Sequence, residues 1–443
     1  PLVRTARPEL PTAVDEVIQK ATAKDPSARY PDILAMIRAL HTATGTEGSA
    51  YAMPTALLDP ERELVNPYQG LRSFQEADAV KFFGRKALVE QLLTRFESKS
   101  EPLEPVEKPI PSDRFLAVVG PSGSGKSSVV KAGFLPALRD GAVPGSDKWF
   151  IVEMIPGTHP LEELEAALLR IAVNPPTSLL EQLEKDERGL VRALKRVLPQ
   201  DESELLLLID QFEELYTLVE DDERRTHFIN SLLAALNDRS SRLRVVVTLR
   251  ADFYDRPLTT PGLAELMRSC MAIVPPLTRA ELEEVIIQPA LQVGAMFEAG
   301  LVPAIVDEVG AQPGALPLLQ YALTELFERR QERLLTLAAY EEIGGVLGAL
   351  GRRAEELYAE LDEQGEEAAR QIFMRLVTLG EGTEDTRRRV LRSELMALQT
   401  SEVFETSKVL DAYGRYRLLT FDHDPVTREP TVEVAHEALL REW

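Results

Sequence analysis

The sequence has few of the residues on which disulfide-linked, metal-bound and membrane-spanning proteins depend. Its single cysteine, Cys270, cannot form an internal disulfide, and no cysteine and histidine cluster has the spacing of a metal site. No apolar run approaches the roughly 18 residues that cross a bilayer, since the longest, such as 205–209, have the length of a strand. No basic and then apolar leader is present. These absences exclude a disulfide scaffold and a membrane-spanning helix, and we expect the protein in the cytoplasm.

Positive charge is also scarce. Lys and Arg number 50 against 72 Asp and Glu, and the formal net charge of −22 repels nucleic-acid backbones and anionic lipid. Apolar residues (44%) and charged residues (28%) are close to globular averages, so the chain is expected to fold. A length of 443 residues suggests two to four domains. Because the chain begins at Pro1 without a methionine, we expect it to be part of a longer protein.

The strongest motif is the glycine-rich stretch GPSGSGKS, which follows the apolar run RFLAVVG and precedes a segment with helical spacing. Its glycines let backbone N–H groups face a phosphate, and the start of the following helix adds to the attraction. Lys126 is expected to reach the β- and γ-phosphates, and the Ser127 hydroxyl to bind Mg²⁺. The expected nucleotide contacts from this loop are Gly120, Pro121, Ser122, Gly123, Ser124, Gly125, Lys126, Ser127 and Ser128.

A second apolar run, LLLLI, ends in Asp210, at the place where an acid that organises Mg²⁺ is expected. Ser127 and Asp210 are therefore the predicted metal ligands. Glu213 and Glu214 follow, and either could polarise the attacking water, although acids at the start of a helix are also favoured by its dipole. Gln211 stands where many related ATPases have a catalytic glutamate, which is compatible with slow turnover or with an amide that orients water.

Arg250 ends a third apolar run, VVVTLR, at the edge of the expected sheet where ligands collect. It is either a sensor of the γ-phosphate or an ion-pair partner of Asp252 or Asp255. A lone histidine such as His436 is more often a packed structural residue than a ligand. The candidate catalytic residues are thus Lys126, Asp210, Glu213, Glu214 and Arg250.

The order of apolar runs and helical segments predicts the fold. The continuously apolar runs alternate with helical segments such as 161–172 and 224–237, a pattern typical of a parallel sheet covered by helices on both faces. After residue 276 the strand signals fade. We predict an α/β fold with a P-loop NTPase parallel-sheet core, followed by a helical lid domain and a winged-helix domain truncated at its end. The predicted limits are 66–275 for the core, 276–350 for the lid and 351–443 for the winged-helix domain.

The N-terminal segment differs from the rest. Residues 9–42 have the spacing of two amphipathic helices, separated by a turn at Asp25-Pro26. This segment resembles the last two helices of a serine/threonine protein kinase C-lobe, in which an arginine at the position of Arg29 fixes the lobe; an unrelated helical hairpin is the alternative. The chain has no Gly-rich kinase loop, HRD or DFG motif, so it cannot carry out kinase chemistry. We expect a kinase tail at 1–45 and a linker at 46–65.

Seven motifs in order also resemble one family, the novel STAND NTPase domain of bacterial signalling proteins, which is related to the NB-ARC, NACHT and AAA+ ATPases. They span residues 66–443: NPYQGLRSFQEADAVKFFGR, GPSGSGKSS, LLLLIDQFEELY, VVVTLRADFY, QPGALPLLQYAL, IGGVLGAL and VEVAHEALLREW. The resemblance implies that Phe83, Gly84 and Arg85 border the adenine and that Arg250 senses the γ-phosphate. It further implies that the turn with Gly314 and Pro317 closes over the base, and that His436 touches the β-phosphate of ADP.

The same resemblance implies a slowly hydrolysing ATP/ADP switch, which alternates between an ADP-closed and an ATP-open state and controls an attached effector. The implied partners are an upstream kinase domain, a downstream WD-repeat propeller and a nucleotide-dependent homo-oligomer. Three alternatives remain at the level of sequence. The P-loop domain could be a regulatory scaffold on a kinase fragment, the winged helix could bind DNA, or the protein could be a metabolic phosphotransferase. The net negative charge argues against the second, and no second-substrate pocket is recognisable for the third.

Overall fold

A computed structural model defines most of the chain. It describes residues 12–23, 29, 64–97, 114–172, 178–219, 221–238, 240–310, 314–378, 386–397, 403–416, 418–424, 429–435, 439–440 and 443. The chain divides into two compact units, residues 1–64 with 291–294, and residues 65–290 with 295–443. Among the described residues, no helix is both long enough and apolar enough to cross a membrane.

In the first unit, the described element is helix α1 (Thr12–Ala21), whose residues Val14 and Val17 are buried. It confirms the first of the two predicted amphipathic helices. The second lies outside the described residues. In the segment between the two predicted helices, Arg29 Nε donates a hydrogen bond to the carbonyl of Ala23 at 2.9 Å. The kinase-tail identity of this segment stays a prediction.

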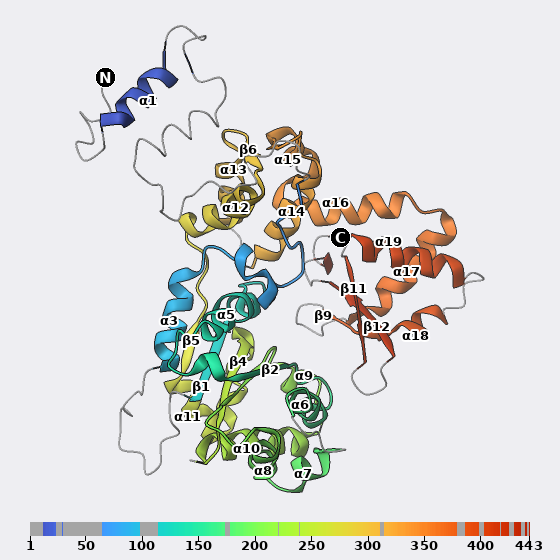
Figure 1. The fold of residues 1–443 in the computed structure, drawn as a ribbon. Helices are drawn as coiled ribbons and strands as arrows, with labels where there is room; N and C mark the ends of the chain where they lie inside the picture. Colours follow the sequence, from blue (N-terminus) through green and yellow to red (C-terminus); the bar gives the residue numbers. More distant parts are fainter. Residues whose placement is uncertain are drawn as a thin grey trace. The chain divides into compact units, whose positions relative to one another are not determined.

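The second unit contains a parallel sheet of five strands (Figure 1), in the order β2-β3-β4-β1-β5. The strands are β1 (Phe115–Gly120), β2 (Phe150–Met154), β3 (Leu205–Ile209), β4 (Leu243–Arg250) and β5 (Met271–Ile273). The three apolar runs that predicted strands are β1, β3 and β4, and they form the centre of the sheet. Strand β4 lies between β1 and β3, so the glycine-rich loop after β1 and Asp210 after β3 are brought to the same edge.

Helices cover both faces of this sheet, as predicted. One face packs on α6 (Pro160–Leu169), α7 (Leu180–Lys185), α8 (Gly189–Val197), α10 (Asp222–Asn237) and α11 (Pro261–Ser269). The other packs on α3 (Lys86–Glu97), η6 (Val129–Phe134) and α5 (Leu135–Arg139). Successive residues of β1 point to opposite faces of the sheet, so Ala117 packs in the core on the first face and Val118 in the core on the second. Strands β1, β3 and β4 are therefore buried on both sides, which explains their continuously apolar sequences.

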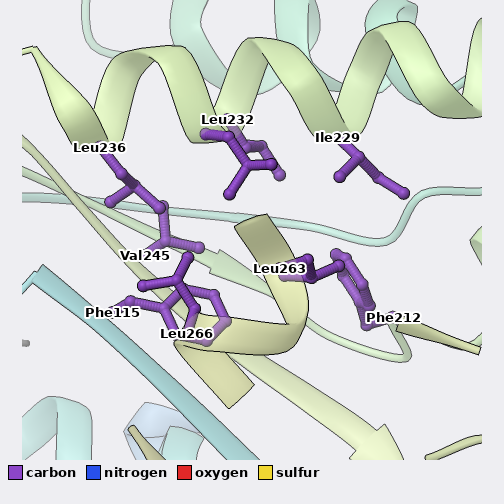
Figure 2. A pocket seen from close by; sticks show the side chains of 9 residues that line it. Phe115, Phe212, Ile229, Leu232, Leu236, Val245, Leu263 and Leu266 are labelled. Carbon is purple, nitrogen blue, oxygen red and sulfur yellow. The ribbon is translucent and has the colours of Figure 1, made fainter. Parts of the chain in front are cut away.

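A small cavity lies in the first of these cores, between α10, α11 and the sheet (Figure 2). Only apolar side chains line it, including Phe115, Phe212, Leu232 and Leu266. Since no charged or hydrogen-bonding side chain faces it, this cavity is a packing gap and not a site for a phosphorylated ligand.

The predicted helical lid is confirmed as a group of helices. These are α12 (Arg279–Val293), α13 (Leu301–Gly310), α14 (Leu316–Glu328), α15 (Leu337–Ile343) and α16 (Gly345–Ala359), with a two-stranded pair formed by β6 (Met296–Phe297) and β7 (Leu334–Leu335). Helix α16 continues past residue 350, so the proposed boundary between lid and winged-helix domain falls inside a helix.

The C-terminal part has the helices and small sheet of a winged-helix domain. Its helices are α17 (Glu363–Arg375), α18 (Arg392–Met396) and α19 (Val403–Arg415). Strands β10 (Val390–Leu391), β12 (Pro430–Val434) and β11 (Leu419–His423) form an antiparallel sheet in that order, and β8 (Val377–Thr378) pairs with β9 (Thr386–Arg387). Trp443 packs against the rings of Tyr358, Phe373 and Tyr413, and its Nε1 donates to Glu355.

Candidate functional site

The phosphate-binding loop (residues 120–128) joins β1 to the short helix α4 (Lys126–Ser128), as the motif predicts. Gly123 and Gly125 have positive φ angles of 70° and 86°, a backbone region that residues with a Cβ rarely adopt. A Cβ at Gly123 would also lie 2.4 Å from the carbonyl oxygen of Gly314. Glycine is therefore required at position 123 by both conformation and space.

The Lys126 side chain folds over this loop. Its Nζ donates hydrogen bonds to the carbonyl oxygens of Gly120 (2.9 Å) and Pro121 (2.8 Å). Burial is the largest influence on the pKa of Lys126 and lowers it, and Arg250 lowers it further, while Glu213 and Asp210 oppose both. A buried ammonium has three donors and gains most from a strong anionic acceptor, which a nucleotide phosphate would supply.

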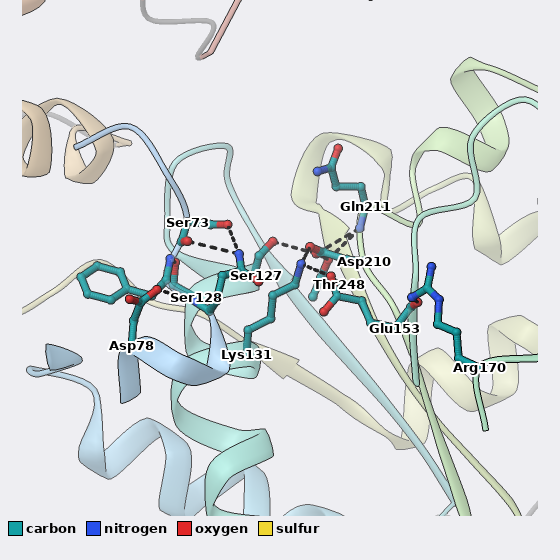
Figure 3. A network of polar contacts seen from close by, with 12 residues as sticks. Ser73, Asp78, Ser127, Ser128, Lys131, Glu153, Arg170, Asp210, Gln211 and Thr248 are labelled. Carbon is teal, nitrogen blue, oxygen red and sulfur yellow. Dashed lines mark hydrogen bonds and ion pairs between the residues drawn. The ribbon is translucent and has the colours of Figure 1, made fainter. Parts of the chain in front are cut away.

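Asp210 is the centre of a buried polar network at the same edge of the sheet (Figure 3). Its Oδ1 accepts hydrogen bonds from Ser127 Oγ at 2.7 Å and Thr248 Oγ1 at 2.6 Å. Its Oδ2 lies 2.9 Å from Lys131 Nζ. Burial by itself raises the pKa of Asp210, but the Lys131 charge and the hydrogen bonds outweigh burial and lower that pKa below its usual value. Asp210 is therefore an ionised carboxylate.

The two predicted metal ligands are thus brought together, and their donor set fits Mg²⁺. Ser127 supplies a hydroxyl oxygen and Asp210 a carboxylate oxygen, both ligands that hard cations prefer. In the described part of the chain, no group of three or more His, Cys, Asp or Glu side chains could hold a metal alone. Mg²⁺ is usually bound through one or two protein oxygens together with substrate phosphates and water, and Ser127 and Asp210 would supply two such oxygens.

The neighbouring acids Glu213 and Glu214 have different surroundings. Glu213 is buried beside Lys126, and its Oε2 accepts a hydrogen bond from the backbone N–H of Arg250 at 3.2 Å. Burial is the main cause that raises its pKa. Glu214 instead accepts a hydrogen bond from the N–H of Gly157 at 3.1 Å. The charge of Glu213 raises the pKa of Lys126, the lysine of the phosphate-binding loop.

Glu214 makes folding stability depend on pH. Burial raises its pKa from 4.5 to about 7, against the lowering effects of the Gly157 N–H and of Arg389 and Arg387. The folded state therefore retains a proton that the unfolded state releases, and this contribution to stability is lost as the pH rises through about 7. When the pH rises from ~5 to ~8, the free energy of unfolding of the wild type should fall by on the order of 1–3 kcal/mol relative to that of Glu214→Gln. Urea unfolding of both proteins at the two pH values tests this, and a pH-independent difference would contradict it.

Arg250 forms the ion pair that the sequence left open as the alternative to a phosphate contact. Its Nη2 and Nε donate to the two carboxylate oxygens of Asp252 at 2.9 and 3.2 Å, and its guanidinium lies 5.7 Å from the ring centre of Phe253. Arg250 also acts electrostatically on Lys126. Arg250 is therefore paired with Asp252 and influences the lysine of the loop electrostatically. Its role as a sensor of the γ-phosphate stays a prediction.

The segment that the family resemblance assigned to the adenine lies against both the loop and the lid. Gly84 has φ 77°, and a Cβ there would lie 2.7 Å from the carbonyl oxygen of Glu281 in α12. Arg85 is buried, and its Nη2 donates to the carbonyl of Ser124 at 3.3 Å. Phe83 is half-buried. These positions connect the loop to α12, but the adenine contact itself stays a prediction.

The lid also touches the phosphate-binding loop directly. Gly314 has φ 80°, and a Cβ on it would lie 2.9 Å from the carbonyl oxygen of Ser122. Pro317 follows in the first turn of α14. This contact places Gly314 of the predicted turn against Ser122 of the loop. His436, the predicted contact from the winged-helix domain, lies outside the described residues.

The close approach of Gly314 gives a testable expectation. Gly314→Ala should weaken the contact between lid and loop, because the new methyl group meets Ser122 and the backbone conformation disfavours alanine. We expect a loss of about 1–3 kcal/mol in local stability. Hydrogen exchange of residues 314–320 and of the phosphate-binding loop measures it, with Gly310→Ala as control, since nothing lies near a Cβ at that position. Equal exchange in both variants would contradict the expected effect.

Sequence analysis missed several residues of the site. Lys131 lies four residues after Ser127, on the following helix, and forms an ion pair with Asp210. Glu153 of β2 forms a second ion pair with Lys131. Thr248 lies two residues before Arg250 on β4. The apolar run predicted its strand, but the partner of Thr248 depends on the register of β4 with β3.

A connection from the lid to the loop was also missed. Residues 66–74 pass between them: the hydroxyl of Tyr68 donates to the carbonyl of Ile286 in α12 at 2.6 Å. The N–H of Phe74 donates to Ser128 Oγ at 3.2 Å. We call residues 66–74 the strap, because they hydrogen-bond to both a lid helix and the phosphate-binding loop.

Comparison with known proteins gives one family match. Residues 67–443 match the model of the family described as Novel STAND NTPase 1. A search of curated proteins found no match. Among solved structures, similar folds include the ORC2 protein of Aeropyrum pernix in ADPNP–ADP complexes, at 15% identity and a TM-score of 0.38, covering 86% of this chain and 93% of that one. Cdc6p of Pyrobaculum aerophilum has 12% identity and a TM-score of 0.36, covering 81% and 91%. At these scores the structural likeness carries no functional argument.

Proposed function

The chain belongs to the Novel STAND NTPase 1 family, and from this premise we propose that it is an ATP- and ADP-binding, slowly hydrolysing switch. The observation that carries the proposal is the junction of the phosphate-binding loop with Asp210, where Ser127 Oγ and an ionised carboxylate meet at 2.7 Å. Loop amides and Lys126 would hold the phosphates. Mg²⁺, when bound, would neutralise phosphate charge between Ser127 and Asp210.

The residues suggest how water attack would be assisted. Glu213 is the favoured general base, because it is buried and interacts electrostatically with Lys126, whereas the carboxylate of Glu214 accepts a hydrogen bond from Gly157. Gln211, directly after Asp210, has φ 55°, and its N–H is held by Thr248 Oγ1 at 2.9 Å. An amide can orient water but cannot remove its proton, which supports slow turnover.

The switch would operate through the contacts between loop and lid. Gly314 packs on Ser122, and the strap bonds the lid through Tyr68 and the loop through Ser128. A change in the phosphates bound at the loop would therefore alter the contacts that the lid residues make with the loop. To move such an equilibrium from about 1:99 to 99:1 requires roughly 5.5 kcal/mol of differential binding. Nucleotide, effector and oligomer contacts would share that free energy.

We further propose domain limits and partners for the switch. The NTPase core would cover 66–275, the lid 276–350 and the winged-helix domain 351–443. The effector would be a serine/threonine kinase domain upstream, a WD-repeat propeller downstream would act as sensor, and the ATP state would form a homo-oligomer. The sequence resemblance to a kinase tail before residue 45 supports the first of these.

Solution measurements on the intact chain test the switch. ADP-loaded and ATP-analogue-loaded protein should differ in X-ray scattering and in hydrogen exchange over the lid, since the two states differ in the contacts of 314–320. Phosphate release should be slow and independent of small-molecule acceptors. Identical scattering and exchange in the two loaded states would contradict the switch, and fast transfer to a small molecule would indicate a phosphotransferase.

A further inference from the structure

A buried lysine next to the candidate cation site has no place in the function proposed above. Lys131 lies in η6, the π-helical segment that follows the phosphate-binding loop, and its side chain is 7% exposed. Its Nζ lies 2.9 Å from Asp210 Oδ2 and 2.5 Å from Glu153 Oε1 (Figure 3). π-Helical turns inside α-helices are often found at functional sites, and this one places an ammonium beneath the loop.

The contacts of Asp210 are divided between its two oxygens. Oδ1 accepts from Ser127 and Thr248, whereas Oδ2 is held by Lys131. The carboxylate plane is thus fixed from two helical segments and from β4. Without Lys131, Oδ2 would be a buried anionic oxygen that has lost its ion-pair partner, and the carboxylate could turn away from Ser127.

We propose that Lys131 is a positioning residue for the cation site, holding Asp210 so that Oδ1 faces Ser127, and that Glu153 in turn holds Lys131. The inference rests on the proposed function, because it assumes that Ser127 and Asp210 bind the metal of a nucleotide complex. Lys131 itself touches neither nucleotide nor metal and acts through Asp210.

A competing effect of charge has the opposite sign. An ammonium close to a divalent cation repels it, so removing Lys131 could tighten metal binding. Glu153 offsets this repulsion, since its carboxylate lies within 2.5 Å of the same ammonium and is more exposed than Asp210. Loss of a partner that orients a metal ligand typically weakens metal binding by about 10–100-fold. Orientation therefore outweighs repulsion, and the net effect of removing Lys131 is weaker Mg²⁺ binding.

The test compares ADP binding without and with metal in Lys131→Met, an uncharged residue of similar length. Calorimetry in EDTA gives the metal-free affinity for ADP. Repeating the titration at a series of Mg²⁺ concentrations gives the Mg²⁺ midpoint, which is the concentration at which half of the Mg²⁺-dependent gain in ADP affinity is reached. Lys131→Met should raise that midpoint at least about tenfold while changing the metal-free ADP affinity less than about threefold. The control Lys148→Met removes an exposed lysine by the same change and should leave both values unaltered.

Each outcome decides the inference. An unchanged or lowered Mg²⁺ midpoint in folded Lys131→Met would overturn it, as would an equal loss of metal-free affinity. If circular dichroism shows that Lys131→Met does not fold, Glu153→Gln keeps the Lys131–Asp210 contact and removes the negative charge that pairs with the lysine. That variant should raise the midpoint at least about threefold, and no rise would overturn the inference. A wild-type chain that binds no ADP in either condition would overturn the proposed function itself, and this inference with it.

Discussion

Lys126→Ala is expected to abolish nucleotide binding, with ADP affinity reduced at least about 100-fold in the presence of Mg²⁺. Lys126 is a buried ammonium whose present acceptors, the carbonyls of Gly120 and Pro121, are neutral and belong to its own loop. A phosphate would replace them with a charged acceptor, so most of the gain from binding depends on this side chain. Calorimetry with ADP measures the loss.

The matched control is Lys148→Ala, which removes an exposed lysine outside the phosphate-binding loop and should bind ADP as the wild type does. Near-normal ADP affinity in a folded Lys126→Ala protein would show that the loop does not hold phosphate through this residue.

Glu213→Gln should lower the rate of ATP hydrolysis by about 10²–10³-fold while changing nucleotide affinity less than about threefold. Glu213 is buried beside Lys126 and close to the loop, and glutamine keeps its shape but cannot accept a proton. Glu214→Gln should change the rate less than about fivefold, because its carboxylate bonds Gly157. Single-turnover phosphate release compares the two variants directly.

The ranking of these two variants is the informative result. If Glu214→Gln were the slower enzyme, the base would be the residue that bonds Gly157, and Glu213 would serve to hold the backbone of Arg250. If neither variant slowed hydrolysis, the attacking water would be activated without either acid, and Gln211 would be the next residue to change.

The sequence predicted those strands of the fold that are buried on both faces of the sheet. Strands β1, β3 and β4 lie in the middle of the sheet, and their burial on both faces produces the apolar runs that predicted them. The two edge strands gave weaker signals. Strand β2 contains Glu153 and has half-buried residues, and β5 has only three residues with Ile273 exposed, so neither has a continuous apolar pattern.

The site could be predicted where its residues are local to a motif. The loop, Lys126, Ser127 and Asp210 follow from short patterns whose spacing is dictated by phosphate and metal chemistry. Thr248 could not be found in that way. It reaches Asp210 because Val247 pairs with Ile209 at the end of β3, and this register is a property of the sheet.

Long-range contacts explain the remaining differences. Gly314 meets Ser122 across nearly two hundred residues of sequence, whereas the family resemblance implied only that the turn with Gly314 and Pro317 closes over the base. Arg250 had two possible partners in sequence, and its pairing with Asp252 was visible only once the 3-10 turn η8 (Ala251–Phe253) had placed the two side chains together.

Calorimetric titration of ADP into the nucleotide-free, monodisperse wild-type chain is the most direct test of the account. We predict one ADP bound for each chain, with an affinity that rises when Mg²⁺ is added, because Ser127 and Asp210 then share a cation with the phosphates. The absence of binding by ADP, ATP and the guanine nucleotides, with Mg²⁺ present, would contradict the central claim that residues 120–128 hold a nucleotide.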